Sequence, residues 1–492
     1  MRVLIACLML VLPSVAWSSD RVALVMGIAS YQYIGALDNT VNDANKIAET
    51  LDDIGFEVTK VLDASTQDMR TAVDEFAFRA ETADLALIYF AGHGVEVQGE
   101  NFLIPADAQV QSNLDVQRQS VSLDDLLEAV DKARKMRIVI LDSCRDNPFG
   151  DAIDLTQAAQ PTGSSNGTRG GGGLALPSPD RGTLVSFAAK DGNIALDGEG
   201  QNSPFALALA EKLRQPNLEI SLMFRQVRDL VLKNTFNRQE PHTYGSLSGI
   251  PFYLTGDGTE ALAQQSDPRQ AWANIRPEQE AQLARLAEGG DTRSMLGLAY
   301  MRLNPEEQRF DPTQAVAFLE RAAKAGSPEA QFELGKLYEK GIGVDRDEAR
   351  ALELYRASAD QNFADAINDL GFMHYQGGLG LARNQKMALA LFERAADLRH
   401  PQAMFNFAAL IDDGLIATKG PEDAANYLYQ ALRSGSTDVL NILTERPNMF
   451  KDQTRKALQK RLQQYDFYAG TIDGDFGPGT QRGIRKAYGL NE

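Results

Sequence analysis

The first half of the chain alternates between two hydrophobic patterns. Five short runs rich in β-branched and aromatic residues are largely apolar on both faces. They read RVALVMGI (21–28), FEVTKVL (56–62), DLALIYFAG (84–92), MRIVILDS (136–143) and GTLVSFA (182–188). Strands that are apolar on both faces are typical of a mostly parallel sheet that is buried between layers of helices.

The segments between these runs have helical periodicity. In residues 38–56, six apolar side chains share one face of a helix, namely Val41, Ala44, Ile47, Ala48, Leu51 and Ile54. Two further segments open with Ser65 and Ser122, whose hydroxyls can cap a first helical turn. Strands that alternate with helices predict an α/β sandwich, which we assign to residues 20–256.

The pattern changes after residues 257–285, which we interpret as a polar linker. Helical segments then recur with a small residue in register, at Gly297, Gly335, Gly371 and Ala408, spaced by 38, 36 and 37 residues. These segments alternate with second amphipathic segments, such as AVAFLERAAKAG, MALALFERAADL and AANYLYQALRSG. Helix pairs of this period predict an α-solenoid over residues 286–446, in which the small residues let paired helices approach closely.

Two other segments have patterns of their own. Residues 150–182 are rich in Gly, Ser and Pro and lack periodicity, which predicts a flexible excursion within the first domain. Residues 450–492 predict a small helical module in which two helices flank a turn-rich centre. That centre contains Gly474 and Gly477, suited to turns, Pro478, suited to a first helical position, and Phe476, suited to packing.

Residues 1–18 have the pattern of a secretory signal peptide, with Arg2, a short apolar run and small residues before the expected cleavage site. No later segment approaches 18 consecutive apolar residues, so we expect a periplasmic or secreted protein without a membrane span. Signal removal would take away Cys7 and leave Cys144 with no internal disulfide partner. The net charge of −18 argues against nucleic acid as a partner.

Cys144 and His93 each directly follow a predicted buried strand. Functional groups of an open α/β sheet gather at the carboxyl ends of its strands, so we expect these two residues side by side. Gly92 and Gly94 flank His93 and predict a tight loop that exposes its imidazole. His242, in a predicted loop, is a more remote candidate for a base.

The same residues also allow purely structural interpretations. A lone cysteine is often a buried small hydrophobe, and a histidine at a strand end can be an ordinary turn residue. His374 and His400 lie in the repeats. A zinc site has little support, because no second cysteine or histidine lies nearby at ligand spacing. We predict no metal and no other cofactor, and the residues give no support to a calcium requirement.

The motifs IYFAGHG and, with its cysteine 51 residues after the histidine, ILDSCRDNPF resemble the caspase-like cysteine peptidase superfamily, which includes metacaspases and paracaspases. The surrounding segments follow the same order, closest to paracaspase-like members. The resemblance implies that His93 is the general base and acid and that Cys144 is the nucleophile that forms a thioester. It also implies an oxyanion site made of the backbone N–H groups of Gly94 and Cys144.

The resemblance extends to substrate choice. Paracaspases receive a basic residue in an acidic pocket, and Asp43 and Asp142 stand at the matching positions, while metacaspases use an aspartate near the positions of Asp191 and Asp197. These four residues imply cleavage after Arg, and less readily after Lys. The alternative is that Asp142 caps the loop around Cys144 and that Asp43 caps a helix turn.

The superfamily also suggests a role for the excursion of residues 150–182. In the family, the segment after the cysteine strand links two subdomains and can be cut. Arg169, in NGTRGGGG, is therefore a candidate self-cleavage site. The alternative is an ordinary linker whose arginine aids solubility.

The other two modules resemble known families as well. The solenoid resembles SEL-type repeats, which implies a protein partner, and the tail resembles a peptidoglycan-binding-like domain of bacterial envelope proteins. We expect an exported cysteine endopeptidase that acts on a polypeptide substrate, recruits protein through its solenoid and is tethered near the cell wall. The alternatives are a tail that merely caps the solenoid, and a catalytically silent envelope scaffold.

Overall fold

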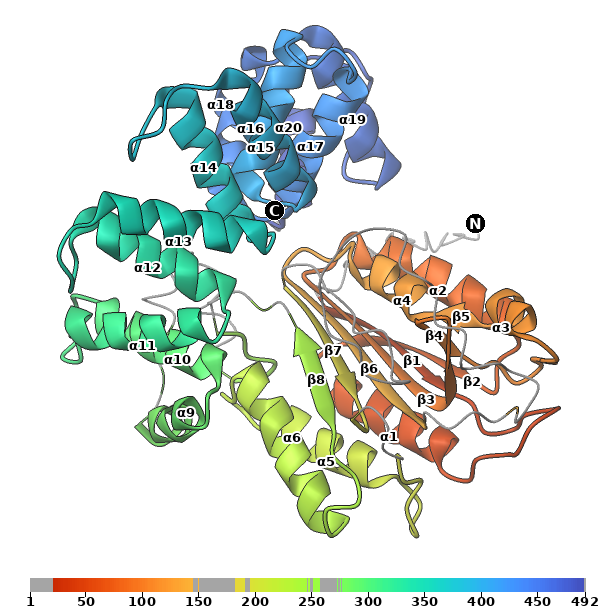
Figure 1. Ribbon diagram of the computed structural model, residues 1–492. Coiled ribbons are helices and arrows are strands. Elements are labelled where there is room, and N and C mark those ends of the chain that lie inside the picture. The colour runs from red at the N-terminus through yellow and green to blue at the C-terminus, as the bar shows by residue number, and fades with distance from the viewer. Residues whose placement is uncertain are drawn as a thin grey trace, which may run out of the picture.

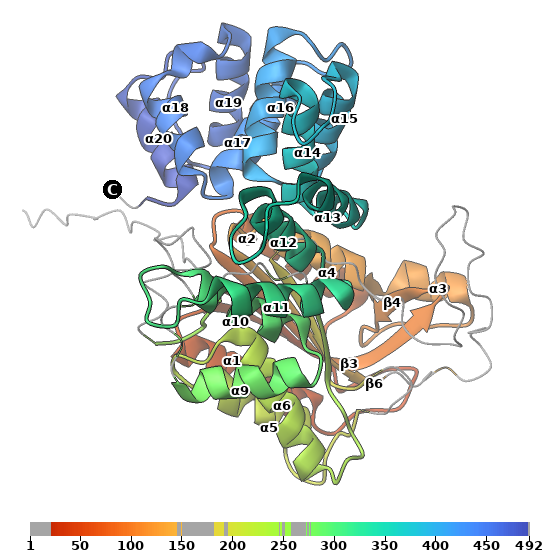
Figure 2. The ribbon, with the colours of Figure 1, turned by 60° about the vertical axis from the view of Figure 1, so that its left-hand side comes forward.

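The computed structural model describes residues 21–144, 149, 182–190, 195–245, 247, 251–256, 272, 275 and 277–490. An α/β domain is followed by an array of helices that arches away from it and returns (Figures 1 and 2). The signal-like residues 1–18 and Arg169 lie outside the described residues.

The sheet of the first domain is mostly parallel, as predicted. Its main strands lie in the order β2-β1-β3-β6-β7-β8, with β8 antiparallel to β7 at one edge. Two short strands, β4 and β5, extend β3 as an antiparallel flap. The strands are β1 Arg21–Gly27, β2 Glu57–Leu62, β3 Leu85–Val97, β4 Glu100–Leu103, β5 Val121–Ser122, β6 Met136–Cys144, β7 Thr183–Phe187 and β8 His242–Gly245.

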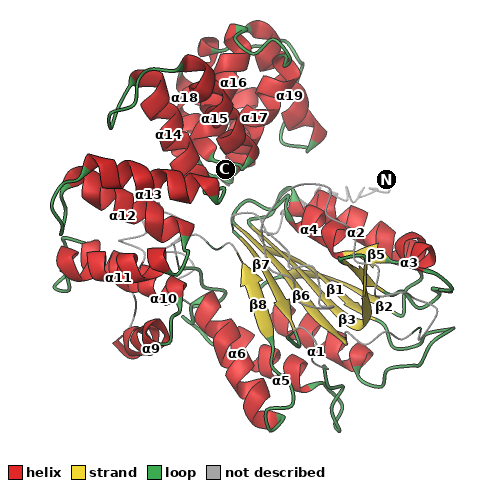
Figure 3. Cartoon of the chain, viewed as in Figure 1, coloured by secondary structure: helices red, strands yellow, loops and turns green. Residues whose placement is uncertain are grey.

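Helices cover both faces of the sheet (Figure 3). On one face, Ala23, Val25 and Leu87 pack against α1, α5 and α6. On the other face, Val22 and Leu24 pack against α2 and α4, as the two-residue period of a strand requires. The helices are α1 Thr40–Asp53, α2 Thr66–Ala80, α3 Asn113–Gln119, α4 Leu123–Val130, α5 Pro204–Leu213 and α6 Ile220–Asn234. Ser65 and Ser122 accept the predicted N-cap hydrogen bonds of α2 and α4.

Three local predictions were wrong, because burial and strand pairing depend on segments that are distant in the sequence. The β2 run is not buried on both faces, because it forms an edge of the sheet and most of its side chains are exposed or half-buried. His93 does not lie in a tight loop, since β3 continues to Val97 and pairs with β4 from Gly94 onwards. His242 begins strand β8 instead of lying in a loop.

The helical array begins earlier than predicted. Residues 277–285, the end of the predicted linker, already form part of α9 Pro277–Glu288. The solenoid continues with α10 Thr292–Leu303, α11 Pro312–Lys324, α12 Pro328–Lys340, α13 Glu348–Asp360, α14 Ala364–Gln376, α15 Gln385–Asp397, α16 Pro401–Asp413 and α17 Pro421–Arg433. The small residues do allow close packing, because a Cβ on Gly371 would lie 2.8 Å from the ring of Phe392 and one on Gly297 would lie 2.7 Å from Trp272.

The solenoid ends with α18 Thr437–Glu445, and the short 3₁₀ helix η2 Pro447–Met449 leads to the tail module, which consists of α19 Asp452–Gln464 and α20 Pro478–Tyr488. Gly474 adopts a positive φ of 79° and Phe476 is buried, as predicted. Gly477 instead has a φ of −65° and serves as the N-cap of α20. No helix in the described part of the chain is long and apolar enough to cross a bilayer.

The far end of the array returns to the first domain beside α2 and α4. The hydroxyl of Tyr429 donates to a carboxylate oxygen of Glu81 at 2.8 Å, and both side chains are buried. The guanidinium of Arg399 donates to the backbone carbonyl of Asp131 at 2.9 Å and pairs with its carboxylate. The described parts of the first domain and the solenoid are therefore joined by direct contacts.

Candidate active site

The sheet brings His93 and Cys144 together. Strands β3 and β6 are parallel neighbours, and the two residues are register partners at the carboxyl end of both strands. Neighbouring strands lie about 4.8 Å apart, so the backbones of His93 and Cys144 are adjacent. Four elements separate the two strands along the chain, namely β4, α3, β5 and α4. His242 lies opposite Phe187, two strands away from β6, and is not placed beside Cys144.

The imidazole of His93 is oriented by a backbone carbonyl. Its Nε2 lies 2.9 Å from the carbonyl oxygen of Gly35. A carbonyl can only accept, so this hydrogen bond holds a proton on Nε2 and leaves Nδ1 free of a proton in the neutral ring. Burial lowers the pKa of His93 below its usual range, partly offset by this bond and by the charge of Asp197. The neutral form, which can act as a base, is favoured.

Tyr31 holds His93 from another side. The backbone N–H of His93 donates to the Tyr31 hydroxyl at 2.7 Å, and the two ring centroids are 4.7 Å apart. A Cβ at position 92 would lie 2.7 Å from the same hydroxyl, which explains the glycine there. Sequence reasoning missed both Tyr31 and Gly35, because neither belongs to the motif around the histidine.

The loop that carries Tyr31 and Gly35 is anchored by Asp63 at the end of β2. One carboxylate oxygen of Asp63 accepts the backbone N–H groups of Ala29 at 2.7 Å and Ser30 at 2.8 Å. Burial by itself would raise the pKa of Asp63, but the donors from Ser30 and Ala29 outweigh it and hold that pKa below its usual value. Asp63 thus positions the loop that positions His93.

Removing this anchor is expected to disturb His93 from a distance. In Asp63→Ala, kcat/KM for a peptide substrate should fall about 10-fold, because misplaced catalytic groups are costly. The acid limb of the pH profile should move to higher pH as His93 becomes more exposed. The donors favour the charged form, so in the wild type this anchoring is present above about pH 4 and is lost as pH falls through the lowered pKa of Asp63.

The matched control is Asp423→Ala. Asp423 also accepts a backbone N–H, from Gly420, but it lies in α17 of the solenoid. An equal loss of activity in both variants, with an unmoved acid limb, would contradict a positioning role for Asp63.

Two carboxylates that were predicted to form the specificity pocket lie close together near the carboxyl end of β6. Asp43, in α1, is 1% exposed, and Asp142, in β6, is 7% exposed. Ser203, the N-cap of α5, joins them: its N–H donates to Asp43 at 2.9 Å and its hydroxyl donates to Asp142 at 2.7 Å. Asn202 also donates to Asp43, and the Tyr89 hydroxyl donates to Asp142 at 3.0 Å.

Among the described residues, the hydrogen-bond donors to the carboxylates of Asp43 and Asp142 come from distant elements. The loop after Cys144, which Asp142 would cap in the alternative interpretation, lies largely outside the described residues. Burial raises the pKa of Asp43 to about 6 and that of Asp142 to about 7, and the charge of Asp43 adds to the second shift. A buried acidic pair of this kind is stabilised by a cation, which would pair with both carboxylates.

Of the other two residues predicted at the pocket, Asp197 lies within the described part of the chain and Asp191 does not. Asp197 lies close enough for its charge to act on Asp43, Asp142 and His93, and burial raises its own pKa. Its carboxylate accepts the backbone N–H of Asp38 at 3.2 Å. Asp191 lies outside the described residues. Within the described part of the chain, no group of three or more His, Cys, Asp or Glu side chains could hold a metal ion.

Profiles of known families match each of the three modules. The sequence profile of the caspase domain matches residues 20–250. The first domain is therefore similar to the caspase family. Behind the caspase domain, the Sel1 repeat profile matches residues 292–327, 328–363 and 364–400, and the profile of a putative peptidoglycan binding domain matches residues 451–487. At the level of the family, the match to the caspase domain supports the cysteine peptidase class, and the order of the three modules agrees with the sequence analysis.

Curated relatives match parts of the chain. Mucosa-associated lymphoid tissue lymphoma translocation protein 1 of Homo sapiens is 30% identical over 147 residues, which is 30% of this chain and 18% of that protein. Chitin synthase regulator SKT5 of Saccharomyces cerevisiae is 42% identical over 83 residues, 16% of this chain and 12% of that protein. The chain thus spans less than a fifth of the length of either relative.

Two solved structures are similar at low identity. Caspase-1 from Spodoptera frugiperda is 15% identical, with a TM-score of 0.35, over 49% of this chain and 91% of that one. A Sel1 repeat protein from Oxalobacter formigenes is 21% identical, with a TM-score of 0.30, over 42% of this chain and 96% of that one.

Proposed function

We propose that the protein is a cysteine endopeptidase with a His93/Cys144 dyad. The observation that supports this most is the register of β3 and β6, which makes the two residues direct neighbours at the carboxyl edge of a caspase-family sheet. The neutral imidazole, with its proton directed at Gly35, would accept the thiol proton at Nδ1. The alternative scaffold function has no comparable support.

The reaction would proceed through an acyl-enzyme. The thiolate of Cys144 attacks the scissile carbonyl carbon, and the backbone N–H groups of Gly94 and Cys144 stabilise the oxyanion. As the C–N bond breaks, His93 gives its proton to the leaving amine, and a thioester remains on Cys144. Water, deprotonated by His93, then hydrolyses the thioester, releases the carboxylic acid and regenerates the thiol.

Cleavage after Arg, and less readily after Lys, is the substrate preference that we propose. Asp43 and Asp142 form a buried acidic pair at the same edge as the dyad, joined by Ser203. A guanidinium can form two parallel charge-assisted hydrogen bonds with a carboxylate, whereas an ammonium offers a point charge. Asp197 adds negative charge nearby. The acidic pair would repel a substrate with Asp before the cleaved bond.

The deciding experiment is turnover of Arg-, Lys- and Asp-ending fluorogenic peptides by the mature protein. We expect the order Arg, then Lys, with no detectable cleavage after Asp. Faster cleavage of the Asp peptide would overturn the specificity, and absence of turnover with all peptides would favour the silent scaffold.

The other modules support a setting for this activity. The Sel1 repeats are suited to recruiting a protein partner, and the tail domain is suited to holding the enzyme near peptidoglycan. Together with the signal-like residues 1–18, these modules favour an exported enzyme that acts in the periplasm or outside the cell.

Self-cleavage at Arg169 is expected for an enzyme of this specificity. The residue lies in a Gly-rich segment and is the type of residue that the acidic pocket would accept. Purified protein should convert within hours to two fragments that Arg169→Gln and Cys144→Ala each prevent, as gel electrophoresis and mass spectrometry of the new amino terminus can establish. The same fragments in Cys144→Ala would instead assign the cut to a contaminating protease.

A further inference from the structure

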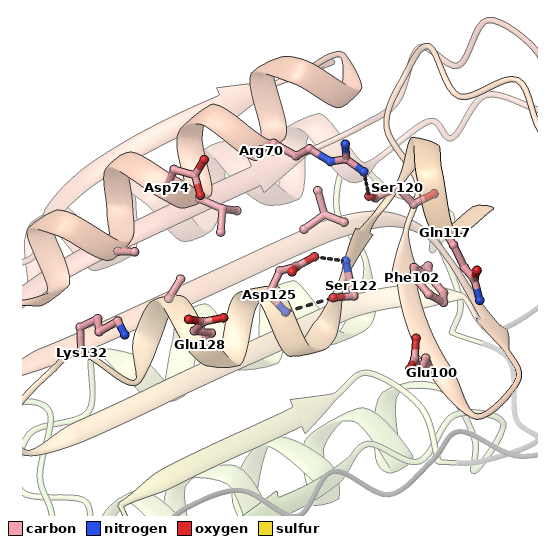
Figure 4. A pocket seen from close by; sticks show the side chains of 14 residues that line it. Arg70, Asp74, Glu100, Phe102, Gln117, Ser120, Ser122, Asp125, Glu128 and Lys132 are labelled. Atoms are coloured by element: carbon pink, nitrogen blue, oxygen red, sulfur yellow. Dashed lines mark hydrogen bonds between the residues drawn. The ribbon is translucent and has the colours of Figure 1, made fainter. Parts of the chain in front are cut away.

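A groove that the peptidase chemistry does not use lies between α2 and α4, and β4 and β5 close one end of it (Figure 4). Its volume is about 700 Å³, within the range of roughly 300–1,000 Å³ that is typical of ligand sites. The helices that line it cover the opposite face of the sheet from α1 and α5, which carry Asp43 and Ser203. It is therefore distinct from the acidic pair.

The groove has an apolar floor and acidic walls. Val73 and Ala77 of α2 and Ala129 of α4 contribute apolar surface. Four carboxylates line it, those of Asp74, Glu100, Asp125 and Glu128, against the two cations Arg70 and Lys132. The groove thus carries an excess of negative charge, which favours a cationic occupant.

Most of these carboxylates are not directly paired with the cations of the groove. Asp125 belongs to the capping box of α4, and Arg70 donates to the backbone carbonyls of Arg118 and Ser120. The other three carboxylates, those of Asp74, Glu100 and Glu128, make no side-chain hydrogen bond or ion pair with any residue that the structure describes. In Figure 4, Asp74 and Glu128 extend from the two facing helices.

A second observation points to a ligand with hydrogen-bonding groups. Ser120 lines the groove and is 2% exposed, yet its hydroxyl has no partner among the described residues. A buried hydroxyl without a partner costs about 1–3 kcal/mol. A peptide group of a ligand can satisfy this hydroxyl by accepting or donating a hydrogen bond.

We propose that this groove binds a basic segment of a polypeptide. A Lys or Arg side chain would lie between Asp74 and Glu128, an apolar neighbour would pack on Val73 and Ala77, and a backbone amide would bond the Ser120 hydroxyl. A bare polyamine satisfies the carboxylates but offers no carbonyl to the hydroxyl and little to the apolar floor. The combination of these features favours a polypeptide.

The test is binding of a labelled peptide to the full chain carrying Cys144→Ala. The probe is an acetylated, amidated hexapeptide of alternating Leu and Lys, with a fluorescein label, followed by anisotropy. Asp74→Asn/Glu128→Gln should weaken binding at least fivefold. The matched control is Glu75→Gln/Asp124→Asn, which removes the same charge from the same helices outside the groove and should leave the affinity unchanged.

Two further variants separate the alternatives. Asp43→Asn should leave the affinity unchanged, because the probe does not need the acidic pair beneath the dyad. Ser120→Ala should weaken binding of the peptide by a few-fold, because the peptide then loses its hydrogen bond to the hydroxyl.

Four results would overturn the proposal. An equal loss in the matched control would indicate diffuse attraction to acidic helices. Loss of binding in Asp43→Asn would place the peptide at the dyad. Spermidine that binds as tightly as the peptide, with the same dependence on Asp74 and Glu128, would make the occupant a polyamine. Unchanged affinity in Asp74→Asn/Glu128→Gln would show that the peptide does not bind in the groove. None of these outcomes depends on whether the protein cleaves peptides.

Discussion

Replacing Cys144 with alanine is expected to lower kcat/KM for an Arg-ending fluorogenic peptide by about 10³-fold or more. The thiolate is the atom that bonds to the substrate, and the alanine variant offers nothing in its place. His93→Ala should cause a loss of similar size, because the thiol then has no base at the adjacent strand position. The two groups act as a unit, so the double variant should be no slower than the slower single variant.

Binding measurements provide the control for these losses. The Cys144→Ala protein should bind an Arg-ending product peptide as tightly as the wild type, since the acidic pair and Ser203 are untouched. Its thermal unfolding should also match. Activity that survives in Cys144→Ala would refute the dyad mechanism, and losses in the two single variants that simply multiply in the double variant would show that the groups do not act together.

The sequence predicted correctly that His93 and Cys144 lie side by side. His93 and Cys144 each follow an apolar run, and two such runs in a parallel sheet end at the same edge. The conformation around His93 was predicted wrongly. Glycines on both sides favoured a loop, but pairing of Gly94 with Leu103 keeps the chain extended. That pairing depends on β4, which the local pattern did not reveal.

The groups that orient His93 could not be predicted for a related reason. The hydrogen bond to Nε2 comes from the carbonyl of Gly35, and a backbone carbonyl leaves no trace in residue type. Tyr31 and Asp63 act through a loop whose position depends on how β1, β2 and β3 are arranged. Such contacts follow from the tertiary structure rather than from the spacing of motifs.

For the acidic pair, too, the sequence indicated the residues but not the groups that surround them. Asp43 and Asp142 were nominated by resemblance, but nothing in their neighbourhood in the sequence indicated Ser203, which lies about 60 residues after Asp142 and bonds to both. Burial, which raises both pKa values, is also a property of the folded chain. The sequence nominated the two carboxylates, while their hydrogen-bond partners and raised pKa values required the structure.

Neutralising either member of the acidic pair is expected to reverse the preference for a charged substrate. In Asp142→Asn and in Asp43→Asn, kcat/KM for an Arg-ending peptide should fall about 100-fold, as expected when a buried charge pair loses one partner. An otherwise identical peptide that ends in citrulline, the uncharged analogue of arginine, should lose much less. The amide oxygen of either asparagine can still accept the hydrogen bonds from Ser203.

The pH dependence of the same pair gives a second measurement. With pKa values of about 6 for Asp43 and about 7 for Asp142, the wild-type pair carries less than its full charge below pH 7. The ratio of kcat/KM for the Arg peptide to that for the citrulline peptide should therefore rise between pH 5 and pH 8. The ratio cancels the titration of His93, which both substrates share. A ratio that stays flat in the wild type would contradict an acidic pocket.

The stability of the protein should change in the opposite sense. A carboxyl whose pKa is raised on folding stabilises the folded chain at low pH, and this contribution is lost as pH rises from about 4 through the folded values of about 6 and 7. Asp142→Asn removes the cost of a buried charge, so at pH 8 it should be more stable than the wild type by on the order of 2 kcal/mol. Its Tm should then be about 5 °C higher. At pH 5 the two Tm values should nearly coincide, and a variant that is equally destabilised at both pH values would mean that Asp142 serves the fold and not the substrate.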